Sequence, residues 1–108
     1  MRGRARVGVR YPAGAVNKTE AAYARFLSTV PGVESFAYEP VKLRLAKATF
    51  YTPDFMVVLS DGGIEMHEVK GFWRDDARVK IKVAAEQFPW FRFRAVTKVG
   101  MGWNFEDF

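Results

Sequence analysis

The turn at residues 60–63 constrains the fold of this chain more than any other feature of its sequence. It reads Ser-Asp-Gly-Gly and separates two segments, 52–59 and 64–70, that are rich in β-branched, aromatic and other apolar residues. Aspartate followed by glycine between two such segments is typical of a β-hairpin, because glycine readily adopts the left-handed conformation that tight turns need. The sequence therefore predicts two adjacent antiparallel strands.

Three charged residues interrupt this otherwise apolar hairpin. Asp54 lies in the first predicted strand, and Glu68 and Lys70 lie in the second. Burying a charged side chain in a sheet costs free energy unless a partner compensates for it. The three residues therefore indicate either an ion cluster that supports the fold or a site that handles charge.

The length of the hairpin loop decides which faces these side chains share, since successive side chains of a strand alternate between faces. A two-residue loop would pair Phe55 with Glu68 and place Asp54 on the opposite face. A three-residue loop at 61–63 would pair Met56 with Glu68 and bring all three charges to one face. We expect the three-residue loop, because such loops are common where one glycine is left-handed.

The neighbours of Glu68 in the same strand face the other way. We expect His67, the only histidine of the chain, to be an ordinary residue of the sheet. Glu65 shares its face, and we expect its carboxylate to be solvated.

Two carboxylates and an ammonium group on one face suit a site for a divalent cation. Carboxylate oxygens, water molecules and substrate phosphates are the usual ligands of Mg²⁺, and Asp54 and Glu68 would supply the carboxylates. The Lys70 ammonium beside them would hold or deprotonate a water molecule, or stabilise charge in a transition state.

The rest of the chain predicts an α/β fold. Helices are expected at 17–30 and from residue 75 or 76 to 88, and strands at 33–41, 52–59, 64–70 and 90–98, with 42–50 either extending the first strand or forming another. The resulting order is helix-strand-strand-strand-helix-strand, with a mixed central sheet flanked by helices. Glu20 lies on the helical stripe that faces the sheet, yet its spacing from Asn17 also fits a capping box, so a site role and a capping role both stay open.

The chain has 108 residues, which is the length of one domain. We expect a basic N-terminal arm at 1–16, a folded domain at 17–98 and an aromatic C-terminal tail at 99–108. The chain contains no cysteine, which excludes disulfides, thiolate zinc sites and cysteine nucleophiles and favours a cytoplasmic location. No apolar run reaches the length of about 20 residues that a membrane-spanning helix needs, so we expect no membrane partner.

The charged residues of the hairpin also carry a resemblance to a known family. Pro-Asp at 53 and 54, followed fourteen residues later by the Glu-Val-Lys of 68–70, resembles the motif of the PD-(D/E)xK nuclease superfamily, whose fold is called restriction endonuclease-like. The wording "TPDF…HEVKG" is most similar to small phage-encoded nucleases and Holliday junction resolvase-like domains.

This resemblance implies a metal-dependent endonuclease that hydrolyses DNA phosphodiester bonds, in the host cytoplasm if a phage encodes it. It assigns metal binding to Asp54, Glu68 and the backbone carbonyl of Val69, with Mg²⁺ as the cofactor and Mn²⁺ as its substitute. It makes Lys70 the catalytic lysine that assists the attacking water and Glu20 the glutamate of the first helix.

The charge balance agrees with a nucleic-acid partner. The chain has 17 Lys and Arg against 12 Asp and Glu, a net charge of +5, which suits a polyanion such as DNA. The candidate DNA contacts are Arg4 and Arg6 of the arm and Arg74, Arg78, Lys80 and Lys82 of the second helix.

Two other functions fit parts of the same pattern. The basic residues alone would support a nucleic-acid-binding module without catalysis. The aromatic tail points to a cleavage subunit that is active only with a recruiting protein partner. A homodimer is a further expectation if both DNA strands are cut, because that reaction needs two active sites.

Overall fold

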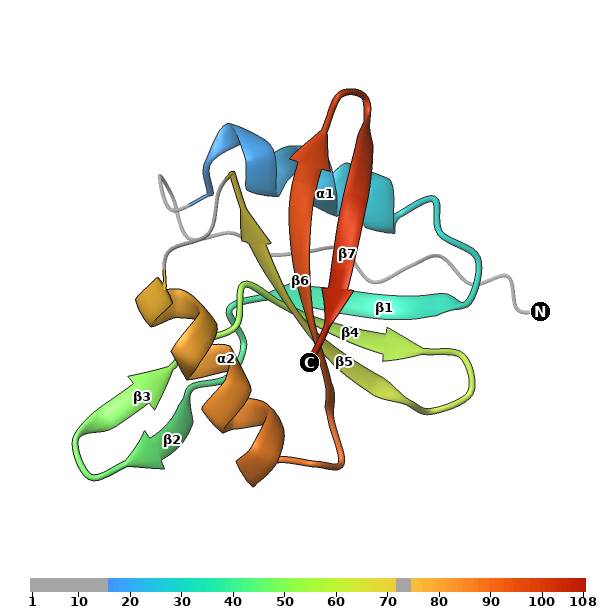
Figure 1. Cartoon of the computed structure of the whole chain (residues 1–108). Helices are drawn as coiled ribbons and strands as arrows, with labels where there is room; N and C mark the ends of the chain where they lie inside the picture. The colour runs from blue at the N-terminus through green and yellow to red at the C-terminus, as the bar shows by residue number, and fades with distance from the viewer. Residues whose placement is uncertain (1–15, 72–74) are drawn as a thin grey trace.

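The computed structural model describes residues 16–71 and 75–108, apart from the side chain of Asp75 (Figure 1). The predicted arm therefore lies outside the described residues, except for Val16. The described elements, in chain order, are α1 (Lys18–Leu27), β1 (Val33–Tyr38), β2 (Leu43–Ala46), β3 (Thr49–Tyr51), β4 (Phe55–Leu59), β5 (Ile64–Lys70), α2 (Asp75–Gln87), β6 (Arg92–Val99) and β7 (Gly102–Asp107). No helix in this part of the chain is both long and apolar enough to cross a membrane.

A mixed sheet forms the centre of the fold, as the sequence predicts, and it has five strands, of which β7 was not predicted. Its strand order is β1-β4-β5-β6-β7. β5 and β6 run parallel, and the other neighbouring pairs are antiparallel. α2 makes the crossover that two parallel neighbours require.

The two helices pack on opposite faces of this sheet. On one face, Tyr23 and Leu27 of α1 join a buried apolar cluster with Phe55. On the other face, Ile81 of α2 joins a cluster with Met66. Each face of the sheet is thus covered by one helix, which buries the apolar side chains of that face. The site described below lies where these two layers meet.

The segment between β1 and β4 differs from the predicted strand. β2 and β3 form a separate two-stranded hairpin that packs against α2 and does not join the central sheet (Figure 1). Glu39, with a φ of 48°, and the following Pro40 end β1 and redirect the chain. Ala48, with a φ of 54°, makes the tight turn between β2 and β3. Left-handed residues other than glycine leave little trace in a sequence, so this hairpin was not predicted.

The pairing of β4 with β5 corrects the predicted register. Met56 lies opposite Met66, whereas the sequence predicted Glu68 at that position, so the expected register is wrong by two residues. A shift of two residues leaves every side chain on its original face. Asp54 therefore stays in phase with Glu68, as predicted.

The loop of this hairpin has three residues, 60–62, and is displaced by one residue from the predicted loop. Gly62, with a φ of 93°, takes the left-handed position and its N–H donates to the Leu59 carbonyl at 2.9 Å. The side chain of Asp61 accepts the N–H of Gly63 at 2.8 Å. These two contacts close the loop one residue earlier than expected.

The residues predicted as a C-terminal tail form the end of β6 and an added edge strand, β7, which pairs with β6 along its length. Trp103 of this strand packs against Tyr23 with ring centroids 5.0 Å apart. Trp103 and Phe105 thus extend the layer that contains α1, whereas Phe108 packs against the cluster on the α2 face.

We expect Gly62→Ala to lower the free energy of unfolding by about 1 kcal/mol, because a side chain in the left-handed conformation costs roughly 1–2 kcal/mol. Urea unfolding monitored by circular dichroism measures the loss. Gly102→Ala is the matched control, since its added Cβ would meet the nearest atom at 3.8 Å and its φ is not left-handed. Equal losses in the two variants would contradict this account of the loop.

Candidate functional site

Asp54 lies just before β4, at the point where β4 and β5 begin to separate. Its buried carboxylate accepts the backbone N–H of Val69 at 2.8 Å. A strand partner would normally offer a carbonyl to this N–H, so the side chain takes the place of a ladder bond. The Asp54 carbonyl in turn accepts the N–H of Glu39 at 2.8 Å. Both contacts fix the carboxylate at the end of the hairpin.

Glu68 lies on the face of β5 that α2 covers, and both of its oxygens have partners. The Tyr51 hydroxyl donates to Oε1 at 2.7 Å. The Lys70 ammonium lies 3.1 Å from Oε2. Burial, followed by the charge of Glu68, raises the pKa of Tyr51, so this hydroxyl remains a donor. Glu68 and Lys70 share one face, as predicted from their spacing, and the carboxylate is held from two sides.

Glu20 comes from α1 and meets the sheet from the other side. The capping box is present: the Glu20 N–H donates to the Asn17 side chain at 2.7 Å, and the Asn17 N–H donates back to Glu20 Oε1 at 3.2 Å. The Tyr38 hydroxyl also donates to Oε1, at 2.8 Å. The carboxylate is buried. Glu20 therefore caps the helix and also faces the other two acids.

The buried acids Glu20, Asp54 and Glu68 are here called the carboxylate cluster, and the charge of Glu20 lies close enough to act on the pKa of the other two. Burial raises the pKa of Asp54 to about 8, the charge of Glu68 and that of Glu20 add to this, and the Val69 N–H and Lys70 oppose it. Burial also raises the pKa of Glu68, against the hydrogen bonds from Tyr51 and Lys70. The cluster concentrates negative charge in a place where water cannot screen it.

Lys70 pairs with Glu68 of this cluster and is the predicted catalytic lysine. Burial acts to lower its pKa, but the charges of Glu68, Asp54 and Glu20 outweigh burial and raise the pKa above its ordinary value. Lys70 is therefore a held ammonium rather than a neutral base. Its side chain is 36% exposed, which leaves the charge in reach of a ligand.

Asp54 and Glu68 are the two acids that a partly hydrated cation of the Mg²⁺ type would use. Mg²⁺ in proteins usually keeps several waters and takes one or two carboxylates with substrate phosphates. Among the residues that the structure describes, no three acidic or histidine side chains are grouped closely enough to hold a metal ion alone. Asp54 uses Oδ2 for the Val69 N–H and makes no hydrogen bond through Oδ1 to a described residue. One carboxylate oxygen beside a second buried acid is the hard donor set that such a cation needs.

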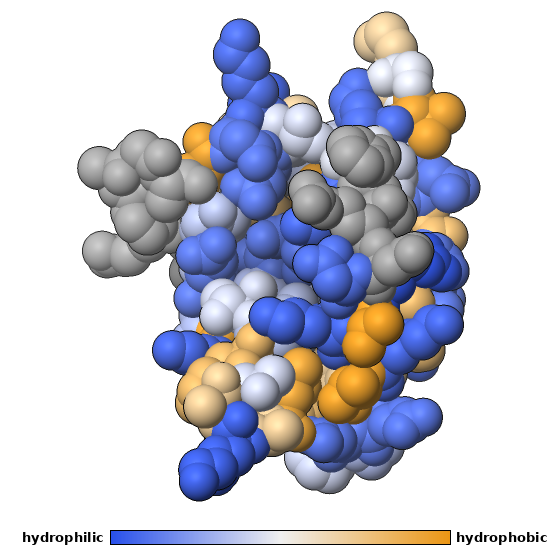
Figure 2. Space-filling view, turned by 60° about the vertical axis from the view of Figure 1, so that its left-hand side comes forward, coloured by the Kyte–Doolittle hydropathy of each residue, from blue (hydrophilic) through white to orange (hydrophobic). Residues whose placement is uncertain are grey.

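A cleft of about 420 Å³ opens beside Glu68 and Lys70. Its walls come from β5, α2 and the β2–β3 hairpin. Three lysines and two acids give the cleft its charge, and two aromatic residues shape its wall: Lys42, Lys70, Lys80, Glu68, Asp76, Phe50 and Tyr51. Figure 2 looks toward the side of the molecule that carries this hairpin, and most of the surface in view is hydrophilic.

The structure separates the predicted DNA contacts. Lys80 lines the cleft and donates to the Phe50 carbonyl at 3.2 Å. Arg78 lies on another side of α2, where it donates to Glu106 of β7 at 2.9 Å. Lys82, four residues further on, shares that side and is exposed. Arg4, Arg6 and Arg74 lie outside the described residues.

Several residues of the site were not predicted from the sequence. Tyr51 orients Glu68, and Tyr38 holds Glu20. Lys42 and Phe50 reach the cleft from the unpredicted hairpin. The position of Tyr51, three residues before Asp54, is the one signal that could have identified a partner for the acids. Val69 contributes its N–H to the site, and metal binding by its carbonyl stays a prediction.

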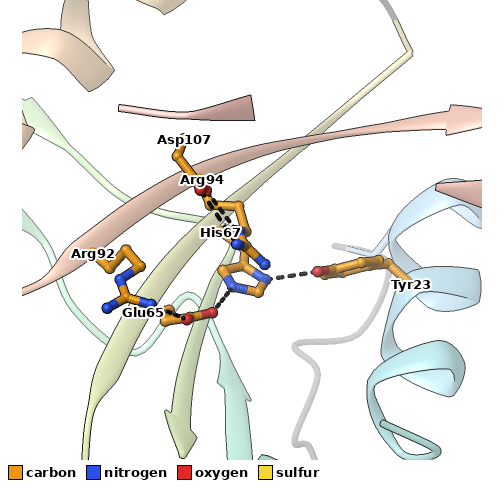
Figure 3. Close-up of polar contacts among 6 residues, drawn as sticks. All are labelled: Tyr23, Glu65, His67, Arg92, Arg94 and Asp107. Atoms are coloured by element: carbon orange, nitrogen blue, oxygen red, sulfur yellow. Dashed lines mark hydrogen bonds and ion pairs between the residues drawn. The ribbon is translucent and has the colours of Figure 1, made fainter. Parts of the chain in front are cut away.

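A second polar cluster lies on the opposite face of β5, beneath α1 (Figure 3). His67 Nδ1 is 2.7 Å from the Tyr23 hydroxyl, and Nε2 is 2.8 Å from Glu65 Oε1. Because a carboxylate only accepts hydrogen bonds, Nε2 carries the proton and Nδ1 accepts from Tyr23. Burial lowers the pKa of His67, which agrees with a neutral ring. Both ring nitrogens have partners, which is the arrangement of an ordinary sheet histidine.

The prediction that Glu65 is solvated is wrong. Its side chain is buried under α1 and beside β6. The hydrogen bond from His67 lowers the pKa of Glu65, and burial opposes this shift. Arg92 approaches the second carboxylate oxygen at 3.6 Å. A buried carboxylate with these partners supports the packing of α1 and does not face the cleft.

Comparisons of the chain with protein-family models, with curated proteins and with solved structures found no match.

We expect Asp54→Asn to raise the free energy of unfolding by more than about 1 kcal/mol at pH 8 in EDTA, since one pKa unit corresponds to about 1.4 kcal/mol. The folded protein binds the Asp54 proton more tightly than the unfolded chain does. The wild type must therefore lose stability as the pH rises from about 4 to about 8, and the variant must lose less.

Urea unfolding of both proteins across this pH range measures the difference. Asp61→Asn is the matched control, because Asp61 is exposed in the hairpin loop and the amide can still accept the Gly63 N–H. A wild type and variant that differ by the same amount at pH 4 and pH 8 would rule out repulsion within the carboxylate cluster.

Proposed function

We propose that this protein is a metal-dependent endonuclease that hydrolyses phosphodiester bonds in DNA. The observation that carries the proposal is the meeting of Asp54, Glu68 and the charged Lys70 at the open end of the β4–β5 hairpin. Buried acids that repel each other are stable only with a proton or a cation between them. A fold that needs support alone would more simply place apolar residues there.

The arrangement of elements around the site supports the same class. With the β2–β3 hairpin and β7 set aside, the order is α1, β1, β4, β5, α2 and β6. This is the order expected of a restriction endonuclease-like core. Glu20, Asp54, Glu68 and Lys70 occupy the positions that the PD-(D/E)xK motif assigns to its functional residues. We therefore propose membership of that superfamily.

Asp54 and Glu68 would hold the cation, Mg²⁺ or Mn²⁺, with the Val69 carbonyl as a further ligand. A bound divalent cation supplies Lewis acidity to a phosphoryl oxygen and makes water a better nucleophile. The Val69 N–H orients Asp54, and the Tyr51 hydroxyl orients Glu68. These two hydrogen bonds keep both carboxylates in position before a substrate arrives.

Lys70 would stabilise the transition state as a fixed positive charge. A water molecule attacks the phosphorus in line and loses a proton to solvent, while the bond from phosphorus to the 3′ oxygen breaks. The 3′ oxygen takes a proton from solvent and leaves as a hydroxyl, and a 5′-phosphate remains. During this step, negative charge is spread over the phosphoryl oxygens. A charged lysine, already held by Glu68 at 3.1 Å, can meet that charge without reorganisation.

A second candidate function is nucleic-acid binding without catalysis. The observation that favours it is the gathering of three ammonium groups, those of Lys42, Lys70 and Lys80, around one cleft. Such a module would bind DNA with an affinity that falls steeply with salt. In such a module, replacing Asp54 by a neutral residue would only strengthen DNA binding.

We expect the protein to nick supercoiled plasmid DNA in Mg²⁺ or Mn²⁺ and to stop in EDTA. Asp54→Asn and Lys70→Met should each lower the rate by about 100-fold or more, because each removes a group that acts on charge in the transition state. Gel electrophoresis of the nicked and linear products gives the rates.

Asp61→Asn is the control for a conservative change in the same hairpin outside the site, and it should cut like the wild type. Cleavage that persists in EDTA, or equal rates for the wild type and the two site variants, would end the proposal of catalysis. Binding without any cleavage would leave the nucleic-acid-binding module.

A further inference from the structure

We propose that Phe50, Lys42 and Lys80 form a subsite for one unpaired nucleotide beside Glu68 and Lys70. The base would stack on the Phe50 ring, and its phosphate would lie between the two ammonium groups. This inference rests on the proposed function for the identity of the ligand, and it names the substrate class: nucleic acid with an unstacked base next to the cleaved phosphate.

Phe50 presents its ring in the wall of the cleft. It is on β3 next to the buried Tyr51, and alternation turns its ring outward, where it is 39% exposed. At this position in the wall of the cleft, a ligand can reach the ring. Aromatic side chains at such positions are the stacking platforms of proteins that bind single strands.

Positive charge surrounds the ring of Phe50. The Lys42 ammonium lies 4.7 Å from the Phe50 ring centroid. Arg44 is the cross-strand partner of Phe50 and lies on the same face of the hairpin. The Lys42 ammonium lies over the ring. A nucleotide carries a negative phosphate with each base, so the Lys42 ammonium would move to the phosphate while the base takes its place on the ring.

Hydrogen bonds between α2 and the β2–β3 hairpin hold the subsite in place. Lys80 of α2 donates to the Phe50 carbonyl at 3.2 Å, and Gln87 donates to the Leu45 carbonyl at 2.8 Å. Two bonds thus tie the hairpin to the helix, above a buried apolar contact that includes Leu45 and Ile81. An ammonium has three donors, so Lys80 can keep this bond and still bind a phosphate oxygen.

The size of the cleft and the stacking of bases in duplex DNA both favour an unpaired base as the ligand. The volume of about 420 Å³ is in the range of pockets that hold small ligands. A paired base in a duplex is stacked on its neighbours and cannot present a face to Phe50. Enzymes that contact a single base in this way act on single strands or take the base out of the stack.

Binding of a fluorescein-labelled single-stranded DNA oligonucleotide, measured by anisotropy in EDTA, tests the subsite without any cleavage. Phe50→Ala and Phe50→Leu should weaken binding by about 5- to 100-fold, the effect of losing one stacked base. Phe50→Tyr, which keeps the ring, should bind like the wild type. A blunt duplex of the same sequence should bind all four proteins within about twofold.

Phe105→Ala is the matched control. Phe105 is also 39% exposed and also has a cation over its ring, Arg94 at 5.0 Å, but it belongs to β7 and not to the cleft. It should bind the oligonucleotide like the wild type. Lys42→Ala and Lys80→Ala should each reduce the slope of log affinity against log salt by about 0.7.

A second readout uses the same oligonucleotide with 2-aminopurine at one position. Its fluorescence should fall on binding to the wild type and to Phe50→Tyr and should not fall with Phe50→Leu. A loss below twofold in both non-aromatic variants overturns the subsite, as does an equal loss on the blunt duplex or with Phe105→Ala. Because these measurements need no metal, a failure of plasmid nicking leaves them intact, and a failure here leaves the catalytic proposal intact.

Discussion

The hydrogen bond from the Val69 N–H to the Asp54 carboxylate determines where the central hairpin opens. A regular ladder would have continued to the end of β5 and would have left no room between the two strands. The side chain ends the ladder instead, and the chain before β4 turns away toward β1 and the β2–β3 hairpin. Glu68 and Lys70 then face a cleft, and Glu20 can approach from α1 across the end of the sheet.

The carboxylate cluster carries a cost in stability that the surrounding residues only partly offset. Tyr38 and Tyr51 each give one hydrogen bond to an acid, and Lys70 gives one positive charge. The Val69 N–H gives a further hydrogen bond to Asp54, and the Asn17 N–H gives one to Glu20. Burial is still the largest cause of the raised pKa of Asp54, and the charges of Glu68 and Glu20 add to it.

Sequence periodicity was enough to predict the hairpin, the capping box and the common face of Glu68 and Lys70, because each depends on neighbours within a few residues. It failed where the answer depended on distant parts of the chain. The loop lies at 60–62 and not at the predicted 61–63, with Gly62 left-handed and the Gly63 N–H bound by the Asp61 side chain. The burial of Glu65 depends on α1 and β6, which no local pattern reveals.

The β2–β3 hairpin is a sheet of its own, inserted between two paired strands of the main sheet. Its removal or replacement would not unpair β1 from β4, since these strands are joined by their own ladder. Over evolution, such an insertion can be exchanged for a longer, shorter or differently charged one while the acids remain in place. The hairpin beside the cleft and the strands that hold the acids can thus diversify at separate rates.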